Sequence, residues 1–196
     1  MKIVQIGANR GNDELTNYLF SNYEIIDFGL FVEANPIHID ELKKCYDRYE
    51  NIIVDNVAIK LPSHNNDVIT IYYHTGDPGY EIASCNIDHI KSHMEYSSFL
   101  DSTGGTISSF EINCITLDQL FEKYSIHELD ILFLDIEGID AEVLLTFDWE
   151  KYHIKRVEFE QIHLGNYRNA VKNMMIGMGY IQTSSMHVNN WAFEMV

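Results

Sequence analysis

Two short segments carry the residues whose types and spacing point to ligand chemistry. The first is an apolar run from Ile3 to Ile6 that ends at Gly7, followed by a tight loop with a second glycine, Gly11. Glycines are needed where the backbone turns sharply and lets a ligand come close. About 20 residues later, a second apolar run ends in Glu33. A carboxylate at this place can accept hydrogen bonds from both hydroxyls of a ribose, so the two segments predict an adenosine-containing ligand.

The loop pattern narrows the choice of ligand. It reads G-x-x-x-G and lacks the middle glycine of G-x-G-x-x-G, which lets the backbone approach a pyrophosphate. A ligand with a ribose and no phosphate fits better, and S-adenosyl-L-methionine is the common one. An NAD(P)-dependent oxidoreductase on a similar fold is the main alternative, and the lack of a Tyr-x-x-x-Lys pair speaks against it. A non-catalytic binding module that keeps the fold is a third alternative.

The elements that position these residues alternate between strands and helices. Apolar runs predict strands over 29–33, 52–59 and 129–134, and helical periodicity separates them. This alternation predicts an α/β fold with a mostly parallel sheet and helices on both faces. We expect a single domain over residues 1–196, with a hairpin-rich insert at about 60–115 that serves as a substrate lid.

Composition excludes several classes of partner. The chain has 196 residues and a net charge of −17, from 30 acidic residues against 13 Lys and Arg. Direct binding to nucleic-acid phosphates or to an anionic membrane is therefore not expected. No signal peptide or membrane-spanning run is evident. We expect the three cysteines to be reduced and to pack as small apolar residues. We expect a cytoplasmic protein; the sequence gives no oligomeric state.

Polar residues recur at the carboxyl ends of the predicted strands, where open α/β sheets bind their ligands. They include Asn9, Glu33, Asn56, Asp135 and Glu137, with Glu160 and His163 after the following strand. At this point the chain resembles the FkbM family of S-adenosylmethionine-dependent methyltransferases. The resemblance rests on segments 6–11, 32–36, 56–59, 116–120 and above all Leu134-Asp135-Ile136-Glu137-Gly138.

The resemblance implies a three-layer, Rossmann-like class I methyltransferase fold, with a seven-stranded sheet whose last strand is antiparallel. It implies methyl transfer, usually to a hydroxyl oxygen of a sugar or another small molecule. Two positions depart from the family pattern: Gln5 stands where an acid is usual, and Phe133 where a lysine is common. Gln5 can still accept a hydrogen bond from the ammonium group of the methionine moiety.

Residue roles follow from the resemblance and from the chemistry of methyl transfer. The expected cofactor-binding residues are Gln5, Gly7, Ala8, Asn9, Gly11, Glu33, Ala34, Asn56, Val57 and Asp135. A hydroxyl nucleophile gains from a nearby base. Glu137 is the first candidate for this catalytic role, and Asp135, Glu160 and His163 are the next candidates. A structural hydrogen bond at a helix start is the alternative for each.

No metal is expected from the sequence. His89 and His93 have the i, i+4 spacing that can bind a metal on one helix face, but no third ligand is evident, so a solvated pair is the favoured reading. Asp135 and Glu137 offer oxygen ligands for Mg²⁺ as a minor alternative.

Overall fold

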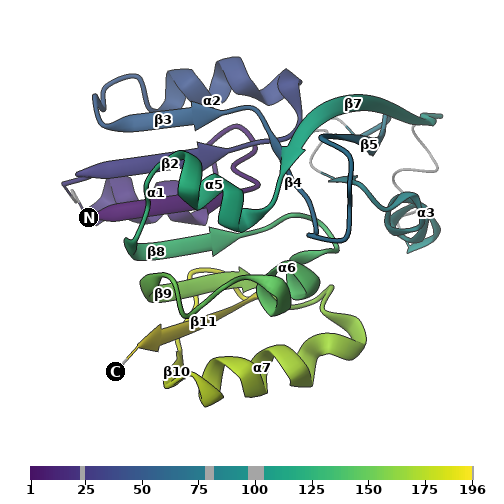
Figure 1. The fold of residues 1–196 in the computed structure, drawn as a ribbon. Helices are drawn as coiled ribbons and strands as arrows, with labels where there is room; N and C mark the ends of the chain where they lie inside the picture. Colours follow the sequence, from purple (N-terminus) through teal and green to yellow (C-terminus); the bar gives the residue numbers. More distant parts are fainter. Residues whose placement is uncertain (23–24, 78–81, 97–103, 196) are drawn as a thin grey trace.

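The computed structural model describes residues 1–22, 25–77, 82–96 and 104–195 and has a central seven-stranded sheet (Figure 1). The strands follow the order β10-β11-β9-β8-β1-β2-β3. Their bounds are Lys2–Ile6 (β1), Phe28–Val32 (β2), Ile52–Asp55 (β3), Glu128–Leu134 (β8), His153–Glu160 (β9), Tyr180–Thr183 (β10) and Asn190–Met195 (β11). β11 runs antiparallel to both of its neighbours, β9 and β10, and the other pairs are parallel. The predicted fold class is confirmed.

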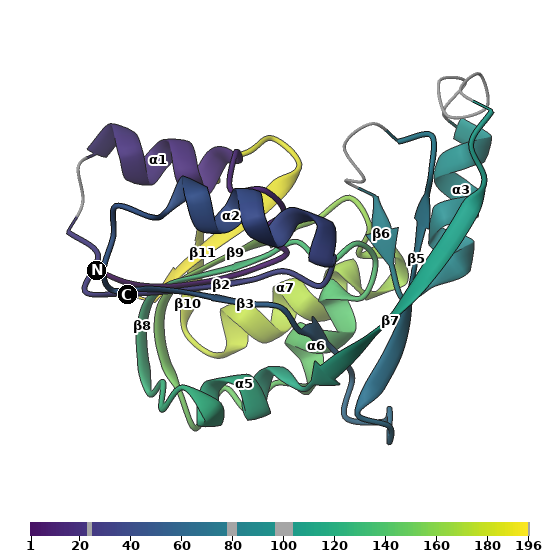
Figure 2. The ribbon, with the colours of Figure 1, turned by 90° about the horizontal axis from the view of Figure 1, so that it is seen from above.

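Helices cover both faces of this sheet (Figure 2). One face carries α1 (Glu14–Asn22) and α2 (Ile39–Cys45), and the other carries α5 (Leu117–Lys123), α6 (Asp140–Thr146) and α7 (Arg168–Gly177). Neighbouring side chains of a strand point to opposite faces. In β1, Ile3 accordingly packs with Leu15 and Leu42 on the first face, whereas Val4 packs with Leu120 on the second. The sheet is thus buried on both sides.

Capping residues fix where several helices begin. Asp13 Oδ1 accepts a hydrogen bond of 2.8 Å from the backbone N–H of Thr16 at the start of α1. Asn35 caps the short 3₁₀ helix η1 (Pro36–His38), whose first residue is proline. Thr116 and Gln119 form a reciprocal capping box at α5. The first two of these helix starts follow the carboxyl ends of β1 and β2, so the caps also shape the loops at this edge of the sheet.

A second sheet stands beyond the carboxyl ends of the central strands (Figure 2). It has the order β4-β7-β5-β6, with bounds Ala58–Ile59, Ile107–Ile115, Val68–His74 and Ala83–Ser84, and it carries α3 (Ile87–Tyr96). The predicted single strand over 52–59 is wrong: it divides into β3 and β4, which belong to different sheets. The side-chain amide of Asn56, at the break, donates to the backbone oxygens of Glu33 and Ala34 and so holds the chain at this turn.

A further 3₁₀ turn, η2 (Gly165–Tyr167), precedes α7.

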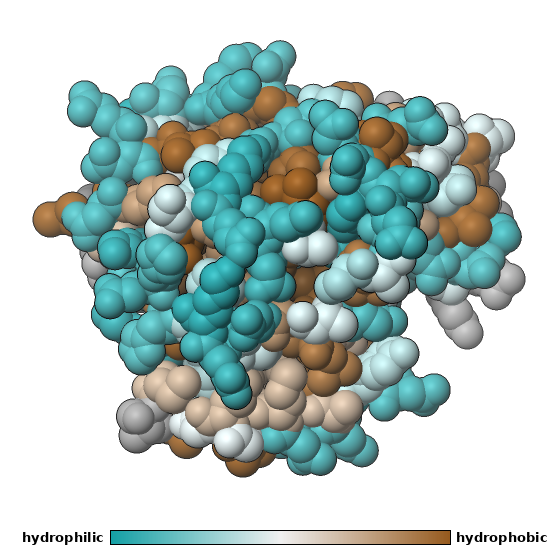
Figure 3. Space-filling view, viewed as in Figure 1, coloured by the Kyte–Doolittle hydropathy of each residue, from teal (hydrophilic) through white to brown (hydrophobic). Residues whose placement is uncertain are grey.

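Among the described residues, no helix has the length and apolar character needed to cross a bilayer. On the face of the molecule seen in Figure 3, hydrophilic side chains predominate and hydrophobic ones appear as patches between them.

Candidate active site

A cavity of about 340 Å³ lies at the carboxyl ends of β1, β2 and β8, between the central sheet and the second sheet. Residues at or just beyond the ends of these strands line it, among them Ile6, Val32 and Asp135. Ile71 and Ala83 of the second sheet, and Cys85 just after β6, close the cavity from the other side. Of the residues expected to bind a cofactor or act in catalysis, the cavity is lined by Gln5, Gly7, Asn9, Glu33, Ala34, Val57, Asp135 and Glu137. Sheet topology therefore brings together residues that are far apart in the sequence.

The glycine loop after β1 is built by backbone constraints. Gly7 has a φ of +80°, and a Cβ atom at this position would lie 1.7 Å from the backbone oxygen of Asp135. Only glycine fits this close crossing of the loops that follow β1 and β8. Gly11 (φ +73°) packs against Leu42 and Cys45 of α2 and does not line the cavity. Its contribution in this structure is to the shape of the loop.

Two other expected contact residues also lie outside the cavity lining. Ala8 is fully buried in the apolar core beneath α1 and α2. Asn56 donates 2.8 Å and 3.1 Å hydrogen bonds to the backbone oxygens of Glu33 and Ala34. Asn56 therefore orients the backbone that carries Glu33.

The carboxylate of Glu33 is held in a fixed position at the cavity wall. Its Oε2 accepts a 2.8 Å hydrogen bond from the N–H of Asn9, and its Oε1 accepts a 2.6 Å bond from the N–H of Asn35. Burial raises the pKa of Glu33, and the backbone hydrogen bonds oppose this change. Each carboxylate oxygen has two acceptor positions. Glu33 therefore keeps acceptor capacity for a ligand's hydroxyl groups.

Three buried acceptor atoms in the cavity lining have no hydrogen-bond partner among the described residues. They are Gln5 Oε1, Asn9 Oδ1 and Asp135 Oδ1. The amide nitrogen of Gln5 donates to Asp13, which orients the side chain. Buried polar atoms are nearly always paired, so such a group points to a missing donor. These three atoms are suited to a cationic donor such as an ammonium group.

Carboxyl groups are concentrated around this end of the cavity. Burial, followed by the charges of Glu137, Asp140 and Glu160, raises the pKa of Asp135 to about 9. Burial and the charges of Glu137 and Asp140 also raise the pKa of Glu160 to about 8. Burial raises the pKa of Asp140 to about 6, although its Oδ1 accepts a 3.2 Å bond from the N–H of Ile136. Such an environment favours a cation over a phosphate.

Glu137 has an unusual backbone conformation. Its φ is +52°, in the left-handed region that few non-glycine residues adopt. The hydroxyl of Ser84 in β6 donates a 2.7 Å hydrogen bond to the backbone oxygen of Glu137. Strained conformations of this kind persist where the surrounding structure enforces them, often at functional sites. The second sheet thus helps to aim the Glu137 carboxylate into the cavity.

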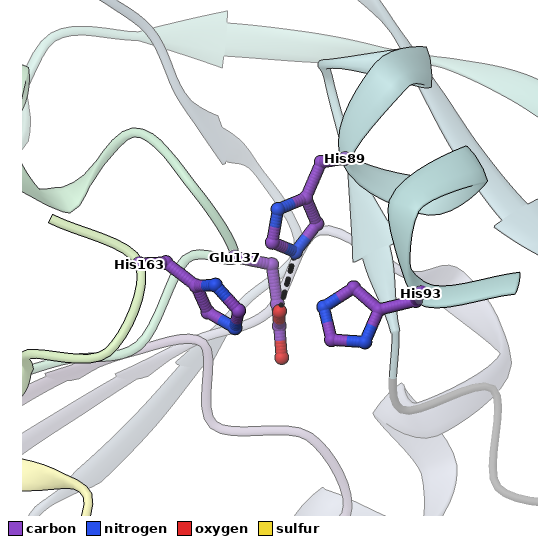
Figure 4. Close-up of side chains that lie close together, drawn as sticks. All are labelled: His89, His93, Glu137 and His163. Atoms are coloured by element: carbon purple, nitrogen blue, oxygen red, sulfur yellow. Dashed lines mark hydrogen bonds and ion pairs between the residues drawn. The ribbon is translucent and has the colours of Figure 1, made fainter. Parts of the chain in front are cut away.

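The histidine pair of α3 does not extend into solvent. His89 Nε2 lies 2.9 Å from Glu137 Oε2, and the exposed fraction of the His89 side chain is only 9%. His93 and His163 complete a group of four side chains (Figure 4). His163 and Glu160 do not line the cavity; His163 Nε2 lies 3.7 Å from Glu160 Oε2. In the sequence, only the i, i+4 spacing of His89 and His93 signals this cluster.

Comparisons with known proteins agree with the resemblance found in the sequence. The sequence profile of the methyltransferase FkbM domain matches residues 5–185. The crystal structure of methyltransferase FkbM from Methylobacillus flagellatus KT superimposes with a TM-score of 0.56 at 13% sequence identity, covering 98% of this chain and 43% of that one. The METTL16 methyltransferase domain gives a TM-score of 0.50 at 11% identity, covering 98% of this chain and 58% of that one.

At these identities, the two structural likenesses establish the fold alone. This chain spans less than two thirds of the length of either structure. No curated protein sequence matches it. The family assignment rests on the profile, which covers most of the chain, and on this ground the chain belongs to the FkbM methyltransferase family.

Proposed function

We propose that this chain binds S-adenosyl-L-methionine and catalyses methyl transfer to a hydroxyl group of a sugar or another small molecule. The observation that carries the proposal is the set of unpartnered acceptors Gln5 Oε1, Asn9 Oδ1 and Asp135 Oδ1, which, among the described residues, share one cavity with the Glu33 carboxylate. An ammonium group has three N–H donors, and a ribose has two adjacent hydroxyls. The residues present therefore fit both polar ends of the cofactor.

Charge supports this ligand over a dinucleotide. Acidic side chains line the cavity at Asp13, Glu14, Glu33, Asp135 and Glu137, whereas none of the described residues that line it is Lys or Arg. A pyrophosphate would meet this acidic lining without a cationic partner. The NAD(P)-dependent oxidoreductase is therefore the weaker candidate.

The apolar part of the cavity suits a purine ring. Ala34, Val57 and Ala58 border it close to Glu33, and Ile71 and Cys85 face it from the second sheet. We assign Ala34 and Val57 to the adenine wall, with Gly7 and Asn9 beside the methionine moiety.

When bound, the cofactor supplies an electrophilic methyl group on a sulfonium. The protein then has to align the acceptor, exclude water and accept a proton. Glu137 lines the cavity and contacts His89, so the pair can take up the proton of an acceptor hydroxyl. Asp135 stands on the same loop. The charge of Glu160 contributes to the raised pKa of Asp135, and His163 belongs to the group of side chains around Glu137. The net charge of −17 favours a small-molecule acceptor over a nucleic acid.

The test has two steps that separate the candidate functions. Isothermal titration calorimetry with S-adenosylmethionine, S-adenosylhomocysteine and NAD⁺ distinguishes a methyltransferase from an oxidoreductase. Detection of S-adenosylhomocysteine formed with a library of hydroxylated acceptors distinguishes an enzyme from a binding module. Cofactor binding without turnover on any acceptor would favour the non-catalytic alternative.

A further inference from the structure

The group formed by His89, His93, Glu137 and His163 comes from three separate parts of the fold. His89 and His93 lie one turn apart on α3, Glu137 follows β8, and His163 follows β9 (Figure 4). One potential ligand atom from each of the four residues lies within 4.8 Å of the other three. The imidazole rings meet at centroid distances of 4.6 Å, 4.6 Å and 5.1 Å. Three imidazoles thus converge with one carboxylate.

We infer that these four residues form a binding site for a divalent transition metal ion, with Zn²⁺ as the best match. Imidazole nitrogen is a preferred ligand of Zn²⁺ and other late first-row metals, whereas Mg²⁺ and Ca²⁺ prefer sites made of oxygen ligands. Three histidines therefore select against the Mg²⁺ alternative that Asp135 and Glu137 alone would favour. Zn²⁺ also accepts the carboxylate as its fourth ligand.

The spacing suits such an ion after small side-chain rotations. Zinc bonds of about 2.0–2.1 Å in a tetrahedral arrangement put neighbouring ligand atoms about 3.4 Å apart. The 2.9 Å separation of His89 Nε2 and Glu137 Oε2 would open slightly, and the longer separations, which are within 4.8 Å, would contract. Histidine and glutamate reach such changes by rotation about side-chain bonds, without movement of the backbone.

The backbone around the cluster is shaped to leave room for it. Gly138 has a φ of +103°, and a Cβ atom there would lie 3.0 Å from Nδ1 of His89. Glu137 is itself left-handed (φ +52°) and is held by the hydroxyl of Ser84. His93 Nε2 is buried and has no hydrogen-bond partner among the described residues. An ordinary solvated histidine pair would need none of these features.

A bound ion would have two consequences. It would join α3 of the second sheet to the loops after β8 and β9, because its ligands come from both sides. It would also stand at the cavity wall, because Glu137 lines the cavity. If the proposed function holds, an acceptor hydroxyl that binds the ion as a fifth ligand would have its pKa lowered and would lose its proton more readily, and the coordinated Glu137 and His89 would then not be the proton acceptors. This second consequence rests on the proposed function; the metal site itself does not.

The site is tested on tag-free protein stripped of metal by a chelator. Co²⁺ is the probe, because its visible absorption reports imidazole coordination, and Zn²⁺ should displace it. We expect one Co²⁺ per chain and a rise in melting temperature on addition of Zn²⁺. His93→Ala, His163→Ala and Glu137→Gln should each weaken binding on the order of 100-fold or more. The exposed His153 supplies the control, and His153→Ala should bind as the wild type does.

Several outcomes would overturn the inference. These are the absence of Co²⁺ and Zn²⁺ binding at stoichiometric concentration, equal affinity of the ligand variants and the control, or preferential binding of Mg²⁺. The proposed function can fail separately: metal binding with no methyl transfer on any acceptor would reject that function and leave the site intact. Undiminished methyl transfer by the metal-free protein would instead reject the role of the ion in the reaction.

Discussion

His89 Nε2 lies 2.9 Å from Glu137 Oε2, although His89 belongs to α3 and Glu137 follows β8, 48 positions further along the chain. The same contact region includes the bond from Ser84 to the backbone of Glu137. The second sheet is thus tied to the rim of the central sheet at the residue that we assign to catalysis. Changes in the 60–115 region should therefore affect turnover as well as acceptor choice.

Replacement of Glu33 should weaken cofactor binding. Glu33→Ala removes the acceptor for the ribose hydroxyls, and hydrogen bonds to charged groups contribute about 1–3 kcal/mol. The dissociation constant for S-adenosylhomocysteine should rise about 5- to 150-fold by calorimetry. Glu33→Gln, which keeps the shape of the side chain, should give a smaller loss. The exposed Glu50 is the matched control, and Glu50→Ala should leave the affinity unchanged.

Replacement of Glu137 should separate binding from catalysis. Glu137→Gln removes the proton acceptor at the cavity wall and should lower turnover on an identified acceptor by about 10²- to 10⁴-fold. Affinity for S-adenosylhomocysteine should stay close to the wild-type value. Glu150→Gln, at an exposed position, should alter neither quantity. A loss of cofactor affinity as large as that of Glu33→Ala would contradict the assigned roles.

Replacement of Gly7 should destabilise the fold itself. In Gly7→Ala, the new methyl group would meet the backbone oxygen of Asp135, and the φ of +80° is unfavourable for any residue with a Cβ. We expect a loss of several kcal/mol in the free energy of unfolding, measured by urea denaturation. A Cβ atom on Gly177 in α7 would meet no neighbouring atom within 4 Å, so Gly177→Ala should be neutral or stabilise by about 0.5–1 kcal/mol.

Replacement of Asp140 should change how stability depends on pH. Burial raises the pKa of Asp140 from 3.8 to about 6, so the fold favours the neutral carboxyl. The free energy of unfolding of the wild type should therefore fall, through this group, as pH rises from about 4 to about 6.

Asp140→Asn keeps a side-chain oxygen that can accept the hydrogen bond from the N–H of Ile136. Because asparagine does not ionise, this variant should not lose stability through this position as pH rises. It should be more stable than the wild type by roughly 2 kcal/mol at pH 7.5, after allowance for the lost charge at a helix start. The difference should shrink toward pH 4. Denaturation curves at several pH values measure it, and a difference that does not vary with pH would reject the assignment.

Much of the fold was predictable because local rules agree with the global arrangement. The apolar run over 129–134 corresponds to β8, and Asp13, Asn35 and Thr116 cap the elements that follow them. The split of the predicted strand 52–59 was not predictable from hydrophobicity, because both halves are apolar. At the break, the side-chain amide of Asn56 donates to the backbone oxygens of Glu33 and Ala34, a long-range contact that no local pattern encodes.

The site was predictable only in part, because some of its residues are brought together by long-range contacts. Strand ends in a parallel sheet converge, so Glu33, Asp135 and Glu137 meet at one cavity as expected. The convergence of His89 and His93 with His163 depends on how the second sheet docks against the first, and no short-range pattern encodes this. Ala8 illustrates the opposite case: its place in the glycine loop predicted a ligand contact, but its side chain faces the core.

The central claim is that the cavity at the ends of β1, β2 and β8 receives S-adenosylmethionine. Calorimetric titration of the wild type and Glu33→Ala with S-adenosylmethionine, S-adenosylhomocysteine and NAD⁺ tests it most directly. We predict one cofactor site per chain for the two adenosyl compounds, with affinity weakened by the substitution, and no measurable binding of NAD⁺. Binding of NAD⁺ in preference to both, or no binding of either adenosyl compound, would contradict it.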